Sequence, residues 1–216
     1  MPIKALAIGA IILVCIRLAF CGESESAAGN VDTVVFDYID GRVRPVMLFK
    51  DGWATTDSMA LLSDNLDKLK AQQPGAWRTW RRESGKVQLR WGDNWKDIAW
   101  NNDYAPPLPD DYRLAGRFSK SGGIGSVRTS STYTFFEDGT FTTGGSVAVN
   151  HTNHLSGANT GIYSIPEAQR GHYRINLYQL ELTFDDGNSV QNSIVISEGD
   201  ITEPEVIYIN GQYYVK

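Results

Sequence analysis

The histidines are the residues most able to bind a metal. His151 and His154 lie three residues apart in Asn150-His-Thr-Asn-His154, and His172 is the remaining histidine. At this spacing two histidines can share a face of a helical turn and bind zinc, with His172 or a carboxylate completing the ligand set. The segment 144–160 is rich in Gly, Asn, Ser and Thr, however, and the chain has no His-Glu-x-x-His motif. We therefore favour a flexible polar hairpin loop and assign no metal or cofactor.

Motifs for nucleophilic catalysis and phosphate binding are missing from the sequence. There is no Gly-x-Ser-x-Gly elbow, and no cysteine follows Cys21. A serine triad assembled from distant residues stays open, because triads have no fixed sequence order. The glycine-rich stretch 121–126 lacks the Gly-Lys-Ser/Thr ending of a P-loop and precedes a predicted strand, so we expect an interstrand loop. The pairs Asp110-Asp111 and Asp185-Asp186 lie at connector or turn positions. We predict no catalytic residue.

Tryptophan and arginine residues gather in the first half of the chain. Aromatic rings and guanidinium groups can bind sugars or acidic partners. The candidate ligand- or glycan-binding residues are Trp77, Trp80, Trp91, Trp95, Trp100, Arg82 and Arg90. Strand alternation places Trp77 and Trp80 on opposite faces, so these rings cannot all point one way. The interpretation that we favour is a small core lined by large aromatic side chains.

The N-terminal residues have the pattern of a secretory leader. Twelve apolar or small residues, Ala5 to Ile16, follow Lys4 and precede a polar run. A membrane-spanning helix needs about 20 apolar residues, whereas Arg17 interrupts this run. We predict a signal peptide over 1–21 and a polar linker over 22–30.

Cys21 determines how the mature chain would begin. The stretch Leu18-Ala-Phe-Cys21-Gly resembles a bacterial lipobox, in which the cysteine becomes the acylated N-terminus, although Phe20 stands where a small residue is usual. Cys15 is the only other cysteine, so the body must fold without disulfides, which its length allows. Ordinary cleavage after Cys21 or Ala28 would instead release a free protein. We predict lipidation at Cys21, with membrane contact only through this lipid or an uncleaved leader.

Composition excludes some partners. The chain carries 25 acidic and 20 basic side chains, for a formal charge of −5. This leaves no basic field for nucleic acid and disfavours a helix lying on anionic lipid. The chain also has 21 glycines and 11% aromatic residues, which favours many turns between aromatic-rich strands. We expect a protein of the bacterial cell envelope, lipid-anchored or periplasmic, or alternatively a secreted one.

The elements that must position these residues fall into two parts. Three prolines in 104–111 predict an extended connector between a Trp-rich β module, 31–103, and a second β domain, 112–216. One amphipathic helix is predicted over 57–73, with Asp57 as its cap. Its apolar positions recur every three or four residues at Met59, Leu62, Leu66 and Leu69.

The second part reads as an antiparallel meander. Asp138-Gly139, Asp186-Gly187 and Asn210-Gly211 are tight-turn dipeptides between short alternating segments. Sequential hairpins commonly close into a barrel, which removes exposed edges. We predict a mainly β fold, α+β overall, with an antiparallel meander or lipocalin-like barrel in the C-terminal half. An open sheet or sandwich is the alternative.

The strand and turn residues of this part also carry a family resemblance. Five segments are similar to the small lipocalin-like domains of exported bacterial lipoproteins: Tyr112–Phe118, Tyr133–Phe141, Gly161–Ile165, Leu180–Gly187 and Ile207–Tyr214. The resemblance covers about half of the chain and implies a calycin-type barrel that holds a small apolar ligand. It carries over no catalytic residues.

Three functions follow from these observations. The first is a non-enzymatic envelope protein whose barrel binds a small apolar ligand or a protein partner. The second is a glycan- or cell-wall-binding module that uses the Trp-rich half. The third is a hydrolase whose site is assembled in space or holds a metal through His151 and His154. We place the first ahead of the others.

Overall fold

The fold is mainly β, as the sequence predicts, with 60% of residues in strands and 12% in helices. It is seen in a computed structural model. The structure describes residues 27–98, 100–124, 127–152, 159–164, 168–196 and 201–216. The predicted leader, with Cys21, lies outside these residues. Within the described residues, no helix combines the length and the apolar character needed to cross a membrane.

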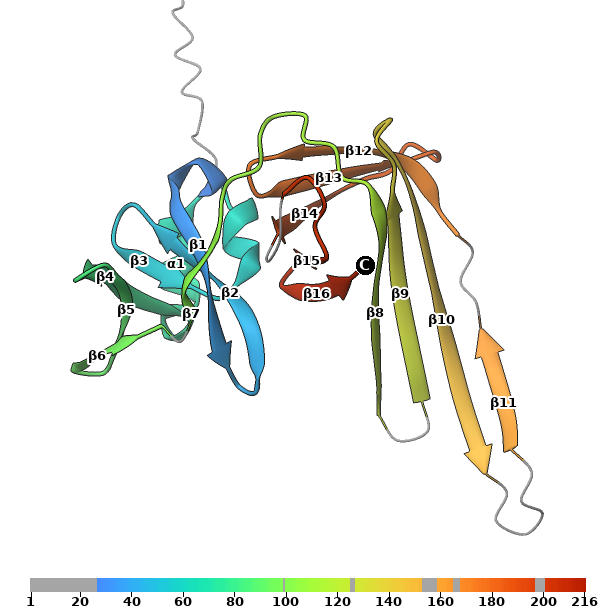
Figure 1. Cartoon of the computed structure of the whole chain (residues 1–216), viewed down its shortest axis with the longest axis horizontal. Coiled ribbons are helices and arrows are strands. Elements are labelled where there is room, and N and C mark those ends of the chain that lie inside the picture. The colour runs from blue at the N-terminus through green and yellow to red at the C-terminus, as the bar shows by residue number, and fades with distance from the viewer. Residues whose placement is uncertain (1–26, 99, 125–126, 153–158, 165–167, 197–200) are drawn as a thin grey trace, which may run out of the picture.

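The first half forms a curled antiparallel sheet (Figure 1). Its strands are β1 (Val31–Ile39), β2 (Arg42–Phe49), β3 (Trp53–Thr55), β4 (Trp77–Glu83), β5 (Lys86–Trp91), β6 (Asn94–Asp97) and β7 (Trp100–Ala105). They lie in the order β6-β5-β4-β3-β2-β1-β7.

Side chains alternate between the two faces of this sheet. One face, the inner face, carries a buried cluster of its own that includes Val46, Ala54 and Leu89. The other, the outer face, contributes Met47 and Trp77 to a second cluster shared with the helices and the barrel.

The predicted helix over 57–73 is wrong in its extent, because the segment forms three short helices. These are the 3-10 helix η2 (Ser58–Leu62), α1 (Leu66–Gln72) and the 3-10 turn η3 (Pro74–Ala76). Asp57 does cap the start, since its side chain accepts from the Met59 N–H. Ser63 is extended, and the Asn65 side chain accepts from the Lys68 N–H to begin α1. Polar residues that cap well therefore divide an apolar pattern that is continuous in sequence.

The second half closes into an antiparallel barrel of eight strands. The strands of this half are β8 (Gly116–Ile124), β9 (Val127–Phe135), β10 (Thr140–Thr152), β11 (Asn159–Ser164), β12 (Arg170–Asn176), β13 (Gln179–Phe184), β14 (Ser189–Ile196), β15 (Val206–Ile209) and β16 (Gln212–Val215). Closure occurs where β9 pairs with β10, while β11 lies on the other edge of β10 and outside the closed ring. The predicted Asn210-Gly211 turn joins β15 to β16, and both residues have positive φ, 50° and 70°.

The barrel interior is filled by side chains. The strand β12 alternates strictly between exposed and buried positions, as a strand with one core face should. The inward-facing residues of β12 belong to a large buried cluster that is rich in aromatic side chains. Phe118, Phe135 and Phe141 of this cluster are each at most 1% exposed. An eight-stranded barrel is just wide enough for its side chains to fill it. The described barrel core therefore resembles a packed core more than a hollow one.

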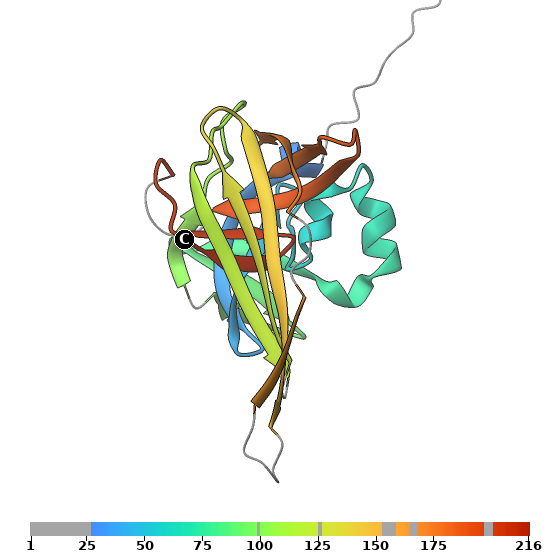
Figure 2. The same ribbon diagram turned by 90° about the vertical axis from the view of Figure 1, so that its right-hand side faces the viewer.

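Strands β8 to β11 project well beyond the rest of the barrel (Figure 2). The sequence predicts loops at 121–126 and 144–160, but β8 continues through Ile124 and β10 continues to Thr152. Strand pairing explains this difference, because β10 pairs with β9 as far as Val149. The Ser130 and Ser146 hydroxyls also hydrogen-bond across these strands at 2.9 Å.

The two halves share one buried cluster. Tyr178, Val195 and Tyr208 from the barrel pack with residues of the outer face and of η2. The Tyr178 hydroxyl donates to the Ala105 carbonyl, and the Gln179 amide donates to the Leu61 carbonyl. The Pro-rich connector is itself anchored, because Leu108 is buried in the barrel core and bridges to Leu177.

Candidate functional site

A cavity with a volume of about 380 Å³ lies beside α1. We call it the α1 cavity. Its polar lining comes from the loop before β1, the β2–β3 turn and the start of α1: Asn30, Asp51, Asp64, Asn65, Asp67 and Lys70. Carboxylates, amides and an ammonium therefore face one space.

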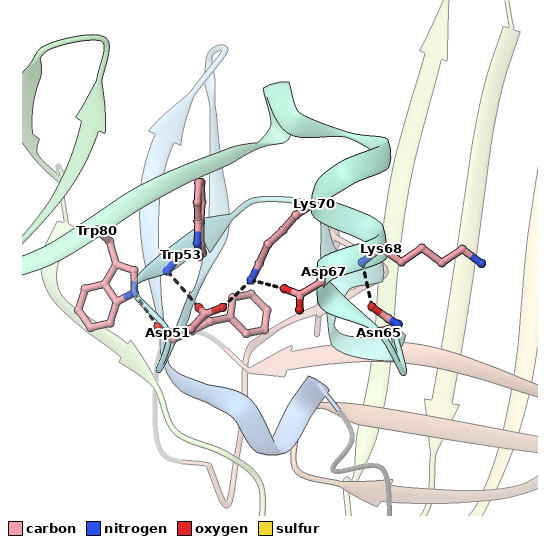
Figure 3. Close-up of polar contacts among 8 residues, drawn as sticks. Asp51, Trp53, Asn65, Asp67, Lys68, Lys70 and Trp80 are labelled. Carbon is pink, nitrogen blue, oxygen red and sulfur yellow. Dashed lines mark hydrogen bonds and ion pairs between the residues drawn. The ribbon is translucent and has the colours of Figure 1, made fainter.

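Lys70 is the centre of this site (Figure 3). Its Nζ lies 2.5 Å from Asp51 Oδ2 and 3.3 Å from Asp67 Oδ1. The same atom lies 5.8 Å from the Trp53 ring centroid and 5.7 Å from that of Trp77. The Lys70 side chain is only 16% exposed. Two carboxylates and two aromatic rings thus hold one ammonium in a fixed position.

Local backbone structure explains how these residues meet. Asp51 and Gly52 form the tight turn between β2 and β3, with Gly52 at a φ of +84°. Asp51 Oδ1 accepts from the Trp53 N–H at 3.2 Å, which fixes the carboxylate. The break before Asn65 turns α1 so that Lys70 points back toward this turn (Figure 3). The sequence predicts a helix over 57–73, but the contact between this segment and the β2–β3 turn is tertiary and has no local signal.

The tryptophans nominated from sequence do not share one surface. Trp80 and Trp91 lie on the inner face with Leu89. Trp80 is the cross-strand partner of Leu89, and Trp91 follows Leu89 by two residues on β5. Trp77 and Trp95 lie on the outer face. Trp77 is buried, and the Trp80 indole N–H donates to the Phe49 carbonyl at 2.8 Å. Trp100 lies in β7, and its side chain is not among those described. The expectation that these rings point to different sides is confirmed.

The two nominated arginines are held by local contacts. Arg82 Nη1 donates to the Tyr104 hydroxyl at 3.2 Å, and the guanidinium lies 5.7 Å from that ring. Arg90 Nε donates to the Gly92 carbonyl at 3.1 Å and pairs with Asp93 at 3.8 Å. Neither lines the α1 cavity. Trp53, Asp51 and Lys70 are the residues that sequence reasoning did not nominate.

Two of the three histidines that were weighed as weak metal ligands, His151 and His172, lie far apart on the barrel strands. His172 is exposed on β12 opposite Thr140, whereas His151 lies opposite Thr160 near the far end of β10. The strand between residues 140 and 151 spans roughly 36 Å at about 3.3 Å per residue, so His172 cannot complete a site with His151. His154 lies outside the described residues. In the described part of the chain, no group of three His, Cys, Asp or Glu is placed to hold a metal ion.

Three tyrosines have side-chain pKa values that burial raises. Burial raises the pKa of Tyr178, with a smaller contribution from the Asp32 carboxylate. Burial also raises the pKa of Tyr133 and Tyr173. Tyr173 donates to the Leu114 carbonyl and accepts from the Leu114 N–H, which is a structural role within the barrel core. The Tyr173 and Tyr178 hydroxyls thus join backbone segments.

Comparison with models of protein families, with curated proteins and with solved structures found no match.

Proposed function

We propose that this chain is a non-catalytic binding protein of the bacterial cell envelope, and that the α1 cavity holds a sugar unit of a glycan. The α1 cavity carries this proposal, because it combines hydroxyl-binding groups with a neighbouring exposed indole. Export rests on the leader predicted over 1–21. Tethering rests on the lipobox-like stretch that ends at Cys21.

The chemistry of the cavity matches a polyhydroxylated ligand. A sugar presents C–H faces, which stack on aromatic rings, and hydroxyls, which both donate and accept. Asp51 and Asp67 supply acceptors, Asn65 supplies both kinds of group, and Lys70 supplies donors. Trp53 is 36% exposed and stands beside the Lys70 ammonium (Figure 3). The volume falls in the range of about 300 to 1,000 Å³ that is usual for ligand pockets.

The interior of the barrel supports a scaffold role better than a ligand-carrying one. Its described core is filled by apolar and aromatic residues. The lipocalin resemblance implies a ligand site inside the barrel. We instead propose a ligand site in the first half of the chain, at the α1 cavity beside the curled sheet.

The test is glycan binding by the full chain expressed in a bacterial host. Retention on purified peptidoglycan and titration with chitotetraose and cellotetraose would be compared for wild type, Trp53→Ala and Trp91→Ala. Trp91 is the matched control, since it is 38% exposed but lies on the inner face. We expect Trp53→Ala to weaken binding about tenfold, because aromatic stacking contributes about 0.5 to 1.5 kcal/mol and a tenfold change corresponds to about 1.4 kcal/mol. We expect Trp91→Ala to leave binding unchanged.

Two results would contradict the proposal. One is wild-type protein that binds none of these glycans. The other is equal loss in both tryptophan variants, which would place the effect in folding instead of the cavity. The intact mass of the same preparation shows whether Cys21 carries acyl chains.

A further inference from the structure

A second, smaller cavity opens on the inner face of the curled sheet. Its volume is about 180 Å³. Its lining includes the inner-face residues Ile39, Val46, Ala54, Arg78, Leu89 and Trp91, and it continues to Thr55 and Thr56 at the end of β3 and to Gly75 and Ala76 of η3. We call it the inner cavity. It lies on the opposite face of the sheet from Trp53, so it is separate from the α1 cavity.

The floor of the inner cavity is apolar. Val46, Ala54 and Leu89 are buried and belong to the inner-face cluster. Such a floor offers no hydrogen bonds, so it favours a hydrocarbon group that leaves water. An apolar cavity of roughly 150 Å³ can hold a benzene-sized ligand. The inner cavity thus matches a single ring or a short branched chain.

The rim of the inner cavity is cationic. The Arg78 guanidinium stacks 4.9 Å from the Trp91 ring centroid, and Lys96 Nζ lies 5.8 Å from the same ring. Arg78 Nη1 donates to the carbonyls of Gly75 and Trp77, each at 2.8 Å. These bonds fix the guanidinium. In the described part of the chain, its Nε and Nη2 have no protein acceptor.

Charge pairing differs between the two faces of β4, β5 and β6. On the outer face, Arg81 pairs with Glu83 at 2.5 Å and Lys86 pairs with Asp97 at 2.8 Å. On the inner face, strand register places Arg78 beside Ala54, Arg82 beside Val87 and Lys96 beside Leu89.

None of these three inner-face cations forms an ion pair with a described carboxylate. Among the described side chains of the sheet, strand register places one carboxylate, that of Asp37, on the inner face, and its cross-strand neighbour is the cation Arg44. The rim is therefore a positive region in a chain whose formal charge is −5.

We infer that the inner cavity binds a small apolar carboxylate, an aromatic or branched-chain acid. The hydrocarbon part rests on Val46, Ala54 and Leu89. The carboxylate faces the free edge of Arg78, where a guanidinium can donate two parallel hydrogen bonds. Lys96 adds a second positive charge at the rim.

The experiment is isothermal titration of the full chain with benzoate and with 3-methylbutanoate, and benzyl alcohol serves as the uncharged comparison. Arg78→Gln removes the charge at the rim. Arg81→Gln is the matched control, because Arg81 also stacks on a tryptophan, 4.3 Å from the Trp95 ring, but on the outer face. We expect Arg78→Gln to weaken benzoate binding about tenfold, as for loss of a charge-assisted hydrogen bond, and Arg81→Gln to change it less than about twofold.

Near-UV circular dichroism checks that each variant keeps its fold. If Arg78→Gln does not fold, Arg78→Lys takes its place in the titration. Because Arg78→Lys keeps the positive charge, it should retain part of the affinity for benzoate. Failure of wild type to bind either acid at millimolar concentration would overturn the inference. Equal loss in Arg81→Gln, or benzyl alcohol that binds as tightly as benzoate, would also overturn it. Trp53→Ala should leave benzoate binding intact, so this result and the glycan result are separable.

Discussion

Lys70 shows how a single residue gives the first half of the chain its site. A partly buried ammonium is stabilising only when its partners satisfy it, and here two carboxylates and two indole rings surround it. Asp51 is 19 positions away in sequence. No local pattern links the two residues, and this explains why sequence reasoning nominated Trp77 but not Trp53 or Lys70.

Tyr178 gives a prediction for pH dependence. Its hydroxyl is buried and donates to the Ala105 carbonyl at 3.0 Å, and burial raises its pKa. A raised pKa means that the neutral form stabilises the fold. This contribution is complete below the unfolded pKa of about 10 and is lost as pH rises through the folded value. We expect the free energy of unfolding to fall above about pH 10, more steeply in wild type than in Tyr178→Phe.

Urea unfolding at several pH values measures this difference. At pH 7 the Tyr178→Phe variant should lose about 1 kcal/mol, the usual net value of one hydrogen bond. Tyr213→Phe is the control, because Tyr213 is 59% exposed and its loss should leave the pH profile unchanged. Parallel profiles for wild type and Tyr178→Phe would refute this role of Tyr178.

At the scale of elements, the projecting strands β8 to β10 depend on glycines that have no space for a side chain. A Cβ at Gly145 would lie 2.7 Å from the Ser130 carbonyl oxygen of β9, whereas a Cβ at the adjacent Gly144 would meet nothing within 4 Å. We expect Gly145→Ala to lower the free energy of unfolding by about 1 to 3 kcal/mol, as overpacking does. Gly144→Ala should be neutral or slightly stabilising.

Denaturant unfolding of the two alanine variants tests this difference directly. Amide hydrogen exchange would locate the loss, which should concentrate at the pairing of Thr132 with Gly144 and Ser130 with Ser146. Equal stability of both variants would show that β9 and β10 separate easily at this position.

The same strands mark the limit of prediction from sequence. The predicted tight-turn dipeptides Asp138-Gly139, Asp186-Gly187 and Asn210-Gly211 each lie between two consecutive barrel strands, because such turn patterns are local. The segment 144–160 lacks apolar alternation, so its composition indicated a loop. Pairing with β9 forms the strand there instead, and strand pairing is a long-range property. The site was only partly predictable for the same reason, since its turn and helix are local but their contact is not.

At the scale of the whole molecule, the two halves that the connector divides in sequence meet in one buried cluster. Phe36 of the curled sheet and Tyr208 of the barrel lie with ring centroids 5.6 Å apart. Val195 of β14 is buried in this cluster, while its neighbour Ile194 points into the barrel core. A change in the barrel core can therefore reach the curled sheet through the two sides of β14.

This coupling predicts that the halves unfold together. All six tryptophans precede residue 101, so their fluorescence reports the curled sheet alone, whereas far-UV circular dichroism reports both sheets. Ile194→Ala should destabilise the chain by about 2 to 5 kcal/mol and lower both midpoints equally, because a cooperative domain unfolds in one transition. Val190→Ala, at an exposed position on the same strand, should lower neither. If the fluorescence midpoint stays fixed while the dichroism midpoint falls in Ile194→Ala, the two halves are independent modules, and the shared cluster does not couple them.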